Sequence, residues 1–205
     1  MTDMAKLLVA TNNQGKIREF AALLEGLPFR LVTLAESGIE VDVEETGTSL
    51  EQNAVEKATA YSALSGLVAV ADDSGLEVDA LGGEPGPLSR RCAGEGATDR
   101  ERNQYLLTRL QDVPWEERGA RFRCVIAIVT PEGKVETCEG VCEGIIAFEP
   151  RGRGGFGYDP VFYLPELGKR MAELTPEAKN RVSHRAKAAQ KARSMLELIG
   201  GARSQ

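Results

Sequence analysis

Apolar residues recur along the chain in two spacings, one typical of strands and the other typical of helices. Short apolar runs that include β-branched residues predict strands at residues 6–11, 29–34 and 67–71. Apolar residues three and four positions apart predict a helix that begins near Lys16 and a second helix over residues 49–64. Strands and helices therefore alternate in the first third of the chain.

Polar residues that cap helices mark where several helices begin. Ser49 with Gln52, and Thr98 with Glu101, have the spacing of a capping box, in which side chains and backbone N–H groups pair reciprocally. Thr175 precedes a proline and is a third candidate N-cap. These signals predict that a helix begins directly after each cap.

The second half of the chain contains two segments typical of a hairpin and ends in a helical segment. Apolar and β-branched residues fill 120–130 and 134–148, on either side of a turn at 131–133. A segment rich in alanine and lysine then predicts a final helix that ends before Gly200. The sequence contains no linker, repeat or low-complexity tract, so we expect residues 1–205 to form a single domain.

Composition and charge argue against several classes of protein. The formal net charge of -6 argues against a surface that binds nucleic acid polymers, because such a surface requires a basic patch. The sequence has no run of about eighteen apolar residues, so we expect no membrane span, and the N-terminus lacks a long apolar signal core. We therefore expect a cytoplasmic protein, and the basic residues of its C-terminal third suit a small polyanion.

Four cysteines, at positions 92, 124, 138 and 142, raise the question of disulfides or a metal site. Cys138 and Cys142 lie in a predicted strand, where four residues span roughly 13 Å. A disulfide requires the two Cα atoms to lie within roughly 7 Å. Zinc is also not expected, because the chain has one histidine and no second close cysteine pair. We expect reduced and mostly buried thiols.

The strand predicted at 67–71 leads directly into a pair of carboxylates. Asp72 and Asp73 follow it, and Ser74 with Gly75 then predicts a sharp turn and a close approach of the backbone. Carboxylates at the end of a strand commonly hold a metal ion or a proton. The alternative is that these four residues form a turn that simply ends the strand.

Three other segments have groups suited to a nucleotide. Asn12–Lys16 lies between a strand and a helix, where free backbone N–H groups, the helix dipole and a lysine favour phosphate. In a glycine-rich segment further on, Phe156 or Tyr158 can stack on a base. His184 beside Arg185 supplies donors for an oxygen-rich ligand. The alternatives are an ordinary turn, a loop with an aromatic anchor in the core, and structural or surface side chains.

Five motifs, in this order, resemble the inosine triphosphate pyrophosphatase family, whose members hydrolyse non-canonical purine nucleoside triphosphates. The resemblance extends from Lys6 to about Leu198. The motifs are Thr11-Asn-Asn-Gln-Gly-Lys16, Glu44-Glu-Thr-Gly47 with Asn53-Ala54 and Lys57-Ala58, Asp72-Asp-Ser-Gly-Leu76, Gly155-Phe-Gly-Tyr-Asp-Pro160, and Ser183-His-Arg185. Each motif is short, and their shared order is the specific part of the resemblance.

The resemblance implies roles for these residues. It implies that magnesium is bound by Glu45 and Asp73, and that Asp73 is the proton acceptor with Asp72 beside it. Residue chemistry alone leaves open which of the two aspartates is the base. The first loop would cradle the triphosphate, and the later motifs would bind the base. The substrate-binding residues implied in this way are Thr11, Asn12, Asn13, Gln14, Gly15, Lys16, Lys57, Ser74, Phe156, Gly157, Tyr158, Asp159, Lys179, His184 and Arg185.

The chemistry of these residue types agrees with such a reaction. Magnesium commonly takes only one or two carboxylates and completes its shell with phosphate oxygens and water. A carboxylate that deprotonates water would allow attack at the α-phosphorus and release pyrophosphate. Donors from His184 or Arg185 would pair with the oxygen at position 6 of hypoxanthine or xanthine. Adenine would leave them unpaired, at a cost of about 1 to 3 kcal/mol for each buried group.

The resemblance also implies an elongated α/β fold with a central mixed twisted sheet flanked by helices, an active-site cleft between two lobes, and a homodimer. The chain departs from the family pattern at two places. Leu88, Arg90 and Cys92 stand where Tyr, Ala and Tyr are typical, which could alter the cleft or the dimer surface. Gln52 replaces a glutamate, which removes one charge near the implied metal.

Three other functions compete with this prediction. The chain could be a pyrophosphatase for other modified nucleotides or for the standard ones. It could also be a module that binds a purine triphosphate without cleaving it, or an interaction protein with an inactive cleft. The acidic residues Glu45, Asp72 and Asp73 argue against these non-catalytic readings, because a pure binder does not need both a metal site and a base.

Overall fold

The computed structural model describes residues 4–202 and contains a mixed β-sheet. The strand order is β2-β1-β3-β5-β6-β7-β8, and β4 pairs with β3. β1 pairs in parallel with β2 and β3, whereas β4, β7 and β8 form antiparallel pairs. The mixed sheet of the expected α/β class is therefore confirmed. The strands are β1 (Lys6–Val9), β2 (Arg30–Thr33), β3 (Val68–Val78), β4 (Pro85–Gly86), β5 (Gly119–Val129), β6 (Val135–Ile146), β7 (Phe162–Leu164) and β8 (Lys169–Arg170).

Helices begin where the capping signals predict. The Ser49, Thr98 and Thr175 side chains each accept a hydrogen bond from the backbone N–H three residues later. The reciprocal box is complete at Thr98, whereas Gln52 accepts from the N–H of Thr48. Within residues 4–202, no helix combines the length and apolar content needed to cross a bilayer. The helices are α1 (Gln14–Leu23), α2 (Leu50–Ser65), α3 (Asp99–Arg109), α4 (Pro176–Val182) and α5 (His184–Ala202), with short 3₁₀ helices at Asp79–Leu81, Trp115–Glu117 and Met171–Glu173.

The chain forms two compact units that interleave along the sequence. The first unit comprises the residues up to Asp73, Cys124–Gly140 and the residues from Arg185 on. The second unit comprises Ser74–Arg123 and Val141–His184. The strands β3, β5 and β6 contribute residues to both units. The single domain over residues 1–205 and the cleft between two lobes stay predictions.

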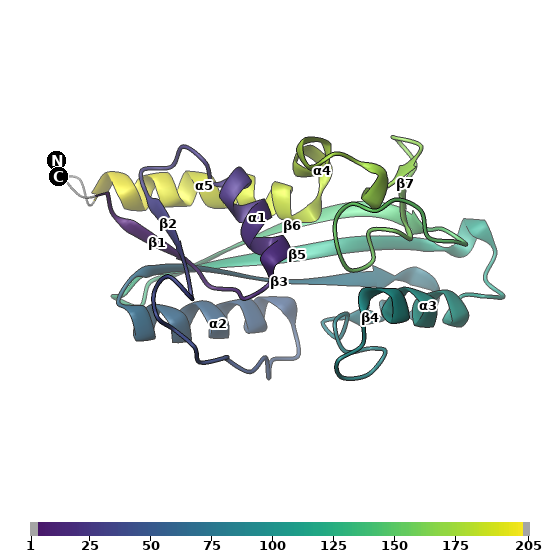
Figure 1. Cartoon of the computed structure of the whole chain (residues 1–205), viewed down its shortest axis with the longest axis horizontal. Helices are drawn as coiled ribbons and strands as arrows, with labels where there is room; N and C mark the ends of the chain where they lie inside the picture. The colour runs from purple at the N-terminus through teal and green to yellow at the C-terminus, as the bar shows by residue number, and fades with distance from the viewer. Residues whose placement is uncertain (1–3, 203–205) are drawn as a thin grey trace. The chain divides into compact units, whose positions relative to one another are not determined.

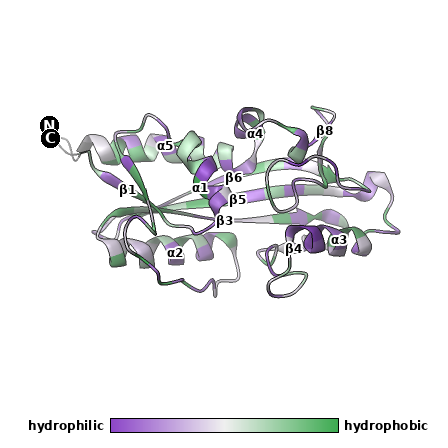
Figure 2. Cartoon of the chain, in the orientation of Figure 1, coloured by the Kyte–Doolittle hydropathy of each residue, from purple (hydrophilic) through white to green (hydrophobic). Residues whose placement is uncertain are grey.

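The core of the first unit has two layers, because alternate strand residues point to opposite faces of the sheet. Leu7 of β1 and Val70 of β3 pack in the cluster that includes α1 and α5 residues. Leu8 and Ala69, one position away, pack in the cluster that includes α2. Figure 1 shows α1 and α5 on one side of these strands and α2 on the other. Figure 2 shows hydrophilic and hydrophobic bands along α2 and α5, as expected for helices with one covered face.

The second unit has its own core. The far end of β3 contributes Leu76 and Val78, and α3 contributes Leu106 and Leu110. These side chains pack with residues of β5, β6 and β7, among them Phe122, whose ring lies 4.4 Å from that of Phe162. This core fixes α3 and the segment that follows β6 in one unit.

The predicted turn at Asp72–Gly75 is wrong, because β3 continues through these residues to Val78. One oxygen of each carboxylate accepts hydrogen bonds from side chains, those of Arg185 for Asp72 and that of Asn53 for Asp73, and the strand continues past both residues. The predicted close approach at Gly75 is correct: a Cβ there would lie 2.3 Å from the carbonyl oxygen of Gly86. The Ser89 hydroxyl accepts from the Leu76 N–H at 2.8 Å and donates to that same carbonyl.

The predicted end of the last helix before Gly200 is also wrong, since α5 continues to Ala202. A Cβ on Gly200 would lie 2.6 Å from Cγ of Pro28, so the glycine serves close packing rather than helix termination. The cysteine prediction is confirmed. All four thiols are free, and Cys124, Cys138 and Cys142 are buried.

The close approach at Gly75 generates a stability prediction. Gly75→Ala should lower the free energy of unfolding by about 1–3 kcal/mol, because two backbones must separate to admit the methyl group. Gly201→Ala is the control, since no atom lies within 4 Å of a Cβ there. It should be neutral or stabilising by up to about 1 kcal/mol. Urea unfolding of both variants measures the difference, and equal effects would contradict the packing argument.

Candidate active site

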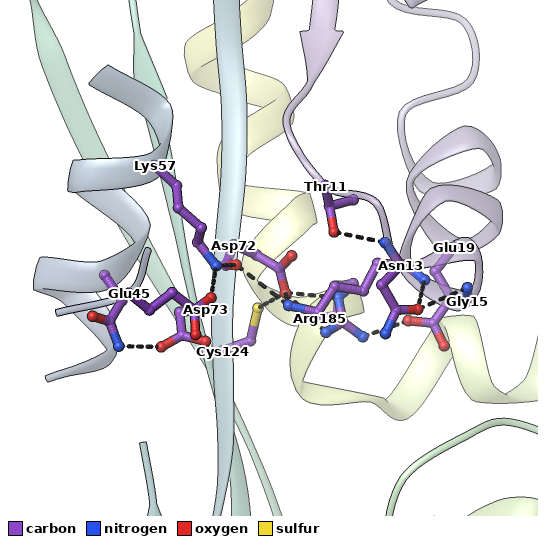
Figure 3. Close-up of polar contacts among 12 residues, drawn as sticks. Thr11, Asn13, Gly15, Glu19, Glu45, Lys57, Asp72, Asp73, Cys124 and Arg185 are labelled. Carbon is purple, nitrogen blue, oxygen red and sulfur yellow. Dashed lines mark hydrogen bonds and ion pairs between the residues drawn. The ribbon is translucent and has the colours of Figure 1, made fainter. Parts of the chain in front are cut away.

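Asp72 is a fully buried carboxylate held by cations of the first unit (Figure 3). Nε and Nη2 of Arg185, at the start of α5, donate to its Oδ2 at 3.1 and 2.8 Å. Nζ of Lys16, in the first turn of α1, lies 3.1 Å from the same oxygen. The other oxygen, Oδ1, is buried and has no hydrogen-bond partner among the described residues.

The charges around Asp72 determine its ionisation. Burial alone would raise the pKa of the carboxyl, but Arg185, Lys16 and Lys57 together lower it well below its usual range. Nη1 of Arg185 also lies 2.5 Å from Oε2 of Glu19, on α1, so the guanidinium bridges two carboxylates. Asp72 is therefore an ionised anchor and a weak base.

Asp73 lies in a different environment, although it is the next residue of β3. Its Oδ2 accepts a hydrogen bond from Nδ2 of Asn53, on α2, at 2.9 Å. Burial and the nearby Glu45 carboxylate raise the pKa of Asp73, against the opposing charge of Lys57. A carboxylate with a raised pKa is a better proton acceptor than Asp72.

Lys57 joins the carboxylates of this group. Its Nζ lies 2.5 Å from Oε1 of Glu45 and donates to the backbone carbonyl of Asp72 at 2.8 Å. Burial would lower the pKa of Lys57, but Asp72, Asp73 and Glu45 raise it, so the ammonium stays charged. The α2 helix thus supplies both a donor for Asp73 and a cation beside Glu45.

Glu45 and Asp73 fit a magnesium ion. They are close enough for one charge to raise the pKa of the other, and a divalent cation would remove that repulsion. Oδ1 of Asn53 is buried without a hydrogen-bond partner in the described part of the chain, which leaves a hard oxygen near the pair. No group of three or more His, Cys, Asp or Glu side chains among the described residues is placed to hold a metal. Magnesium does not require such a group, since it commonly uses one or two carboxylates.

The predicted phosphate loop is largely capped by its own side chains. Asn13 is the N-cap of α1, and its Oδ1 accepts from the N–H groups of Gly15 and Lys16 at 2.8 and 3.1 Å. The hydroxyl of Thr11 accepts from the Asn13 N–H at 3.2 Å. The expectation that these backbone N–H groups are free is therefore wrong for residues 13, 15 and 16. Asn12 and Gln14 are exposed, and the Lys16 ammonium points to Asp72.

The glycine-rich segment of the second unit forms a loop with one half-buried ring. Asp159 holds the loop together, because its Oδ2 accepts from the Phe156 N–H at 2.9 Å and from Nζ of Lys179 at 2.5 Å. That Nζ also lies 4.7 Å from the centre of the Phe156 ring. Tyr158 is buried, so of the two predicted aromatics Phe156 is the more exposed.

The structure also places the other predicted residues of the second unit and two of the departures from the family pattern. The Tyr158 hydroxyl donates to the carbonyl of Ser89 at 2.8 Å and lies 2.8 Å from Sγ of Cys92. Burial and Cys92 raise the pKa of Tyr158. Cys92, a departure from the family pattern, thus replaces an aromatic with a polar contact, whereas Leu88 is exposed. His184 is buried and stacks on Phe122 at 4.7 Å, and Ser74 is half-buried in β3.

The sequence prediction missed four polar residues that hold the predicted ones. Glu19 lies three positions after Lys16 on α1, a spacing that places both on one helix face. Asn53 belonged to a quoted motif but received no role. Asp99 and Asn103 of α3 contact Gly157, and their four-residue spacing on one helix was the available signal.

The chain is similar to known proteins over most of its length. The Ham1 family model matches residues 7–195 of the chain. A protein from Geobacter sulfurreducens named dITP/XTP pyrophosphatase is 53% identical over 185 residues, which cover 90% of this chain and 93% of that protein. One of the same name from Desulforamulus reducens is 51% identical over 194 residues, or 95% and 96% of the two chains. The structure of a HAM1 protein from Coxiella burnetii matches with a TM-score of 0.86 and 42% identity, covering 94% of this chain and 98% of that one.

The buried ion pair generates a prediction about stability and pH. Asp72→Asn should lower the free energy of unfolding by about 3–5 kcal/mol at pH 7, because it leaves Arg185 buried beside a neutral group. The folded pKa of Asp72 is lower than that of an unfolded aspartate, near 3.9, so the unfolded state binds more protons between these values. The stabilisation is therefore complete above roughly pH 5 and shrinks as the pH falls below about 4.

Urea unfolding at several pH values measures this stabilisation. The exposed Asp112→Asn is the control, with an expected change within about 0.5 kcal/mol. A difference between wild type and Asp72→Asn that is small at pH 7, or that grows as the pH falls, would contradict the assignment.

Proposed function

This chain belongs to the Ham1 family, and we propose that it hydrolyses non-canonical purine nucleoside triphosphates, dITP, XTP and ITP, to the nucleoside monophosphate and pyrophosphate. The observation that carries the proposal is the Lys57 ammonium, which lies 2.5 Å from Glu45 and donates to the backbone carbonyl of Asp72, the residue before Asp73. Such a group suits a metal-bound polyphosphate and a water nucleophile. Relatives named dITP/XTP pyrophosphatase support the choice of substrate, since they match this chain over nearly its whole length.

The proposed cofactor is Mg²⁺, held by Glu45 and Asp73. When bound, it supplies positive charge that offsets the charge of the phosphate oxygens. Lys57 keeps its charge next to Glu45, so it adds to the same positive field. Asn53 donates to Asp73 and fixes the orientation of the carboxylate.

Asp73, rather than Asp72, is the proposed base. Both oxygens of Asp72 are buried, and its Oδ2 accepts from Arg185 and lies beside Lys16. In the proposed reaction Asp73 takes a proton from water as the water oxygen attacks the α-phosphorus. The bond from that phosphorus to the bridging oxygen breaks, and the electron pair leaves with pyrophosphate. Asp72 then serves to hold Lys16 and Arg185 in place.

We propose that some of the remaining predicted residues bind the phosphates and that the others bind the base. We propose that the Lys16 ammonium and the exposed side chains of Asn12 and Gln14 bind phosphate, with Thr11 and Asn13 fixing the start of α1. Ser74, half-buried in β3, stays a proposed substrate contact.

Base recognition is proposed for the glycine-rich loop of the second unit. Phe156 supplies a ring for stacking, and Lys179 with Asp159 fixes that ring and the loop. His184, stacked on Phe122, stays a proposed donor to the base. Arg185 donates to Asp72 and Glu19, and in the proposed site these two contacts hold its guanidinium in place. A further contact of Arg185 with the base stays a prediction.

We also propose a homodimer in the cytoplasm, on the resemblance and the composition given above. Sedimentation equilibrium at micromolar concentration should give twice the chain mass of 22.1 kDa. A mass of one chain would contradict the dimer.

The proposed reaction predicts the outcome of a substrate panel. With Mg²⁺, pyrophosphate release should be fast for ITP, dITP and XTP and at least about a hundredfold slower for GTP, ATP and dUTP. Chelation should abolish release. Asp73→Asn should also abolish it while the protein stays folded, because the base and a metal ligand are both lost.

Asp112→Asn is the matched control, since it makes the same change at an exposed position and should keep full activity. A preference for dUTP or a standard nucleotide would favour a pyrophosphatase of other specificity. Tight binding of ITP without release would favour a binding module.

The Asn53 contact predicts a change in metal dependence. Asn53→Ala should raise the Mg²⁺ concentration for half-maximal activity by about 10- to 100-fold, because it removes the donor that orients Asp73. Thr59→Ala, at an exposed position of α2, should leave it unchanged. Magnesium titrations of activity for the two variants measure the effect. An unchanged half-saturation in Asn53→Ala would count against Asp73 as a ligand.

A further inference from the structure

Gly157 is held at both of its backbone hydrogen-bonding groups by side chains of a single helix. Its N–H donates to Oδ2 of Asp99 at 2.7 Å. Its carbonyl accepts from Nδ2 of Asn103 at 2.9 Å. The two side chains are four residues apart on α3 and therefore lie on the same face of that helix.

The two contacts hold a residue whose backbone has unusual conformational freedom. Gly157 has a φ of +63°, and no atom lies within 4 Å of a Cβ built on it. No side chain at this position contributes to packing, and glycine adopts either sign of φ with little cost. The two hydrogen bonds to α3 therefore restrict the conformation of Gly157, beside the contacts of Asp159 with Phe156.

The helix start that carries Asp99 is itself well anchored. Asp99 is the first residue of α3, and Arg102 pairs with its other carboxylate oxygen. Nδ2 of Asn103 also donates to the carbonyl of Asp99 at 2.7 Å, and Asn103 is buried. The reciprocal hydrogen bonds between Thr98 and Glu101 cap the first turn of α3. We call the two hydrogen bonds from Asp99 and Asn103 to Gly157 the clamp. Both of its side chains are held by further contacts within the first turns of α3.

We propose that Asp99 and Asn103 are positioning residues that set base specificity by holding Gly157, and with it Phe156. The inference rests on the proposed function. Gly157 connects Phe156, the ring placed for stacking, to Tyr158, whose hydroxyl is fixed to Ser89 and Cys92. The Tyr158 hydroxyl anchors the chain on one side of Gly157, and Asp159 accepts from the Phe156 N–H on the other. The Gly157 peptide, held by α3, links the two, so a change in its backbone alters how Phe156 is placed relative to Tyr158. Neither α3 residue has to touch the substrate.

Loss of the clamp should reduce discrimination between bases rather than the chemical step. The decisive quantity is the ratio of kcat/KM for dITP to that for dGTP. A general loss of stability lowers both values together and leaves the ratio unchanged. A loop that no longer holds its backbone and the Phe156 ring in one arrangement against the base lowers the ratio.

Four variants separate these effects. Asp99→Ala and Asn103→Ala each remove one of the two hydrogen bonds to Gly157. Alanine has the highest helix propensity, so it is a suitable replacement within α3. Asp99→Asn is the conservative variant, because its amide oxygen can still accept from the Gly157 N–H. Thr98→Ala removes the N-cap and destabilises the same helix start without a contact to Gly157.

The ratio should fall by about tenfold or more in Asp99→Ala and Asn103→Ala, and stay near the wild-type value in Asp99→Asn and Thr98→Ala. Hydrogen exchange of a peptide spanning residues 151–160, without substrate, should be faster in Asp99→Ala than in Thr98→Ala.

Unchanged ratios in both alanine variants would overturn the inference, as would unchanged exchange in Asp99→Ala. A wild-type enzyme without preference for dITP would contradict the proposed function instead. The exchange rates would then still decide whether the clamp exists.

Discussion

The buried ion pair between Asp72 and Arg185 is the contact on which the site of the first unit depends. A buried charge requires a partner of opposite charge. The guanidinium of Arg185, in the first turn of α5, pairs with both Asp72 on β3 and Glu19 on α1. Lys16 lies on the other side of Asp72. Three segments far apart in the sequence are thereby fixed around one oxygen atom. Lys16, which we propose to bind phosphate, is thus held in place in the ligand-free protein, which is the condition for electrostatic catalysis without reorganisation.

Two adjacent aspartates acquire different properties because a strand alternates its side chains. Val70 belongs to the core cluster of α1 and α5, so Asp72 projects to that side and meets Arg185 and Lys16. Ala71 belongs to the cluster of α2, so Asp73 projects to the other side and meets Asn53. The same strand thus presents a strongly ionised anchor on one face and a carboxylate with a raised pKa on the other. A turn at this position would not have separated them.

Local signals in the sequence predicted local structure well. The caps at Ser49, Thr98 and Thr175, the hairpin and the free thiols are all confirmed, because each depends on a few neighbouring residues. The predicted turn at Asp72–Gly75 is wrong: β3 continues through it, and Asp72 pairs there with Arg185, 113 residues away in the sequence. The turn propensities of neighbouring residues carry no information about a contact with so distant a residue. The quoted motifs include Glu45, Asp72 and Asp73, whose roles stay predictions. Glu19, Asp99 and Asn103 contact predicted residues but lie outside those motifs.

The division of roles between Asp72 and Asp73 is the central claim, and NMR titration of the aspartate side-chain carboxyl carbons tests it most directly. The metal-free protein should show Asp73 titrating above the usual value near 3.9, and Asp72 ionised down to the lowest pH at which the protein stays folded. Addition of Mg²⁺ should shift the Asp73 signal and leave that of Asp72 nearly unchanged. The reverse order of titration, or a magnesium shift confined to Asp72, would contradict the account.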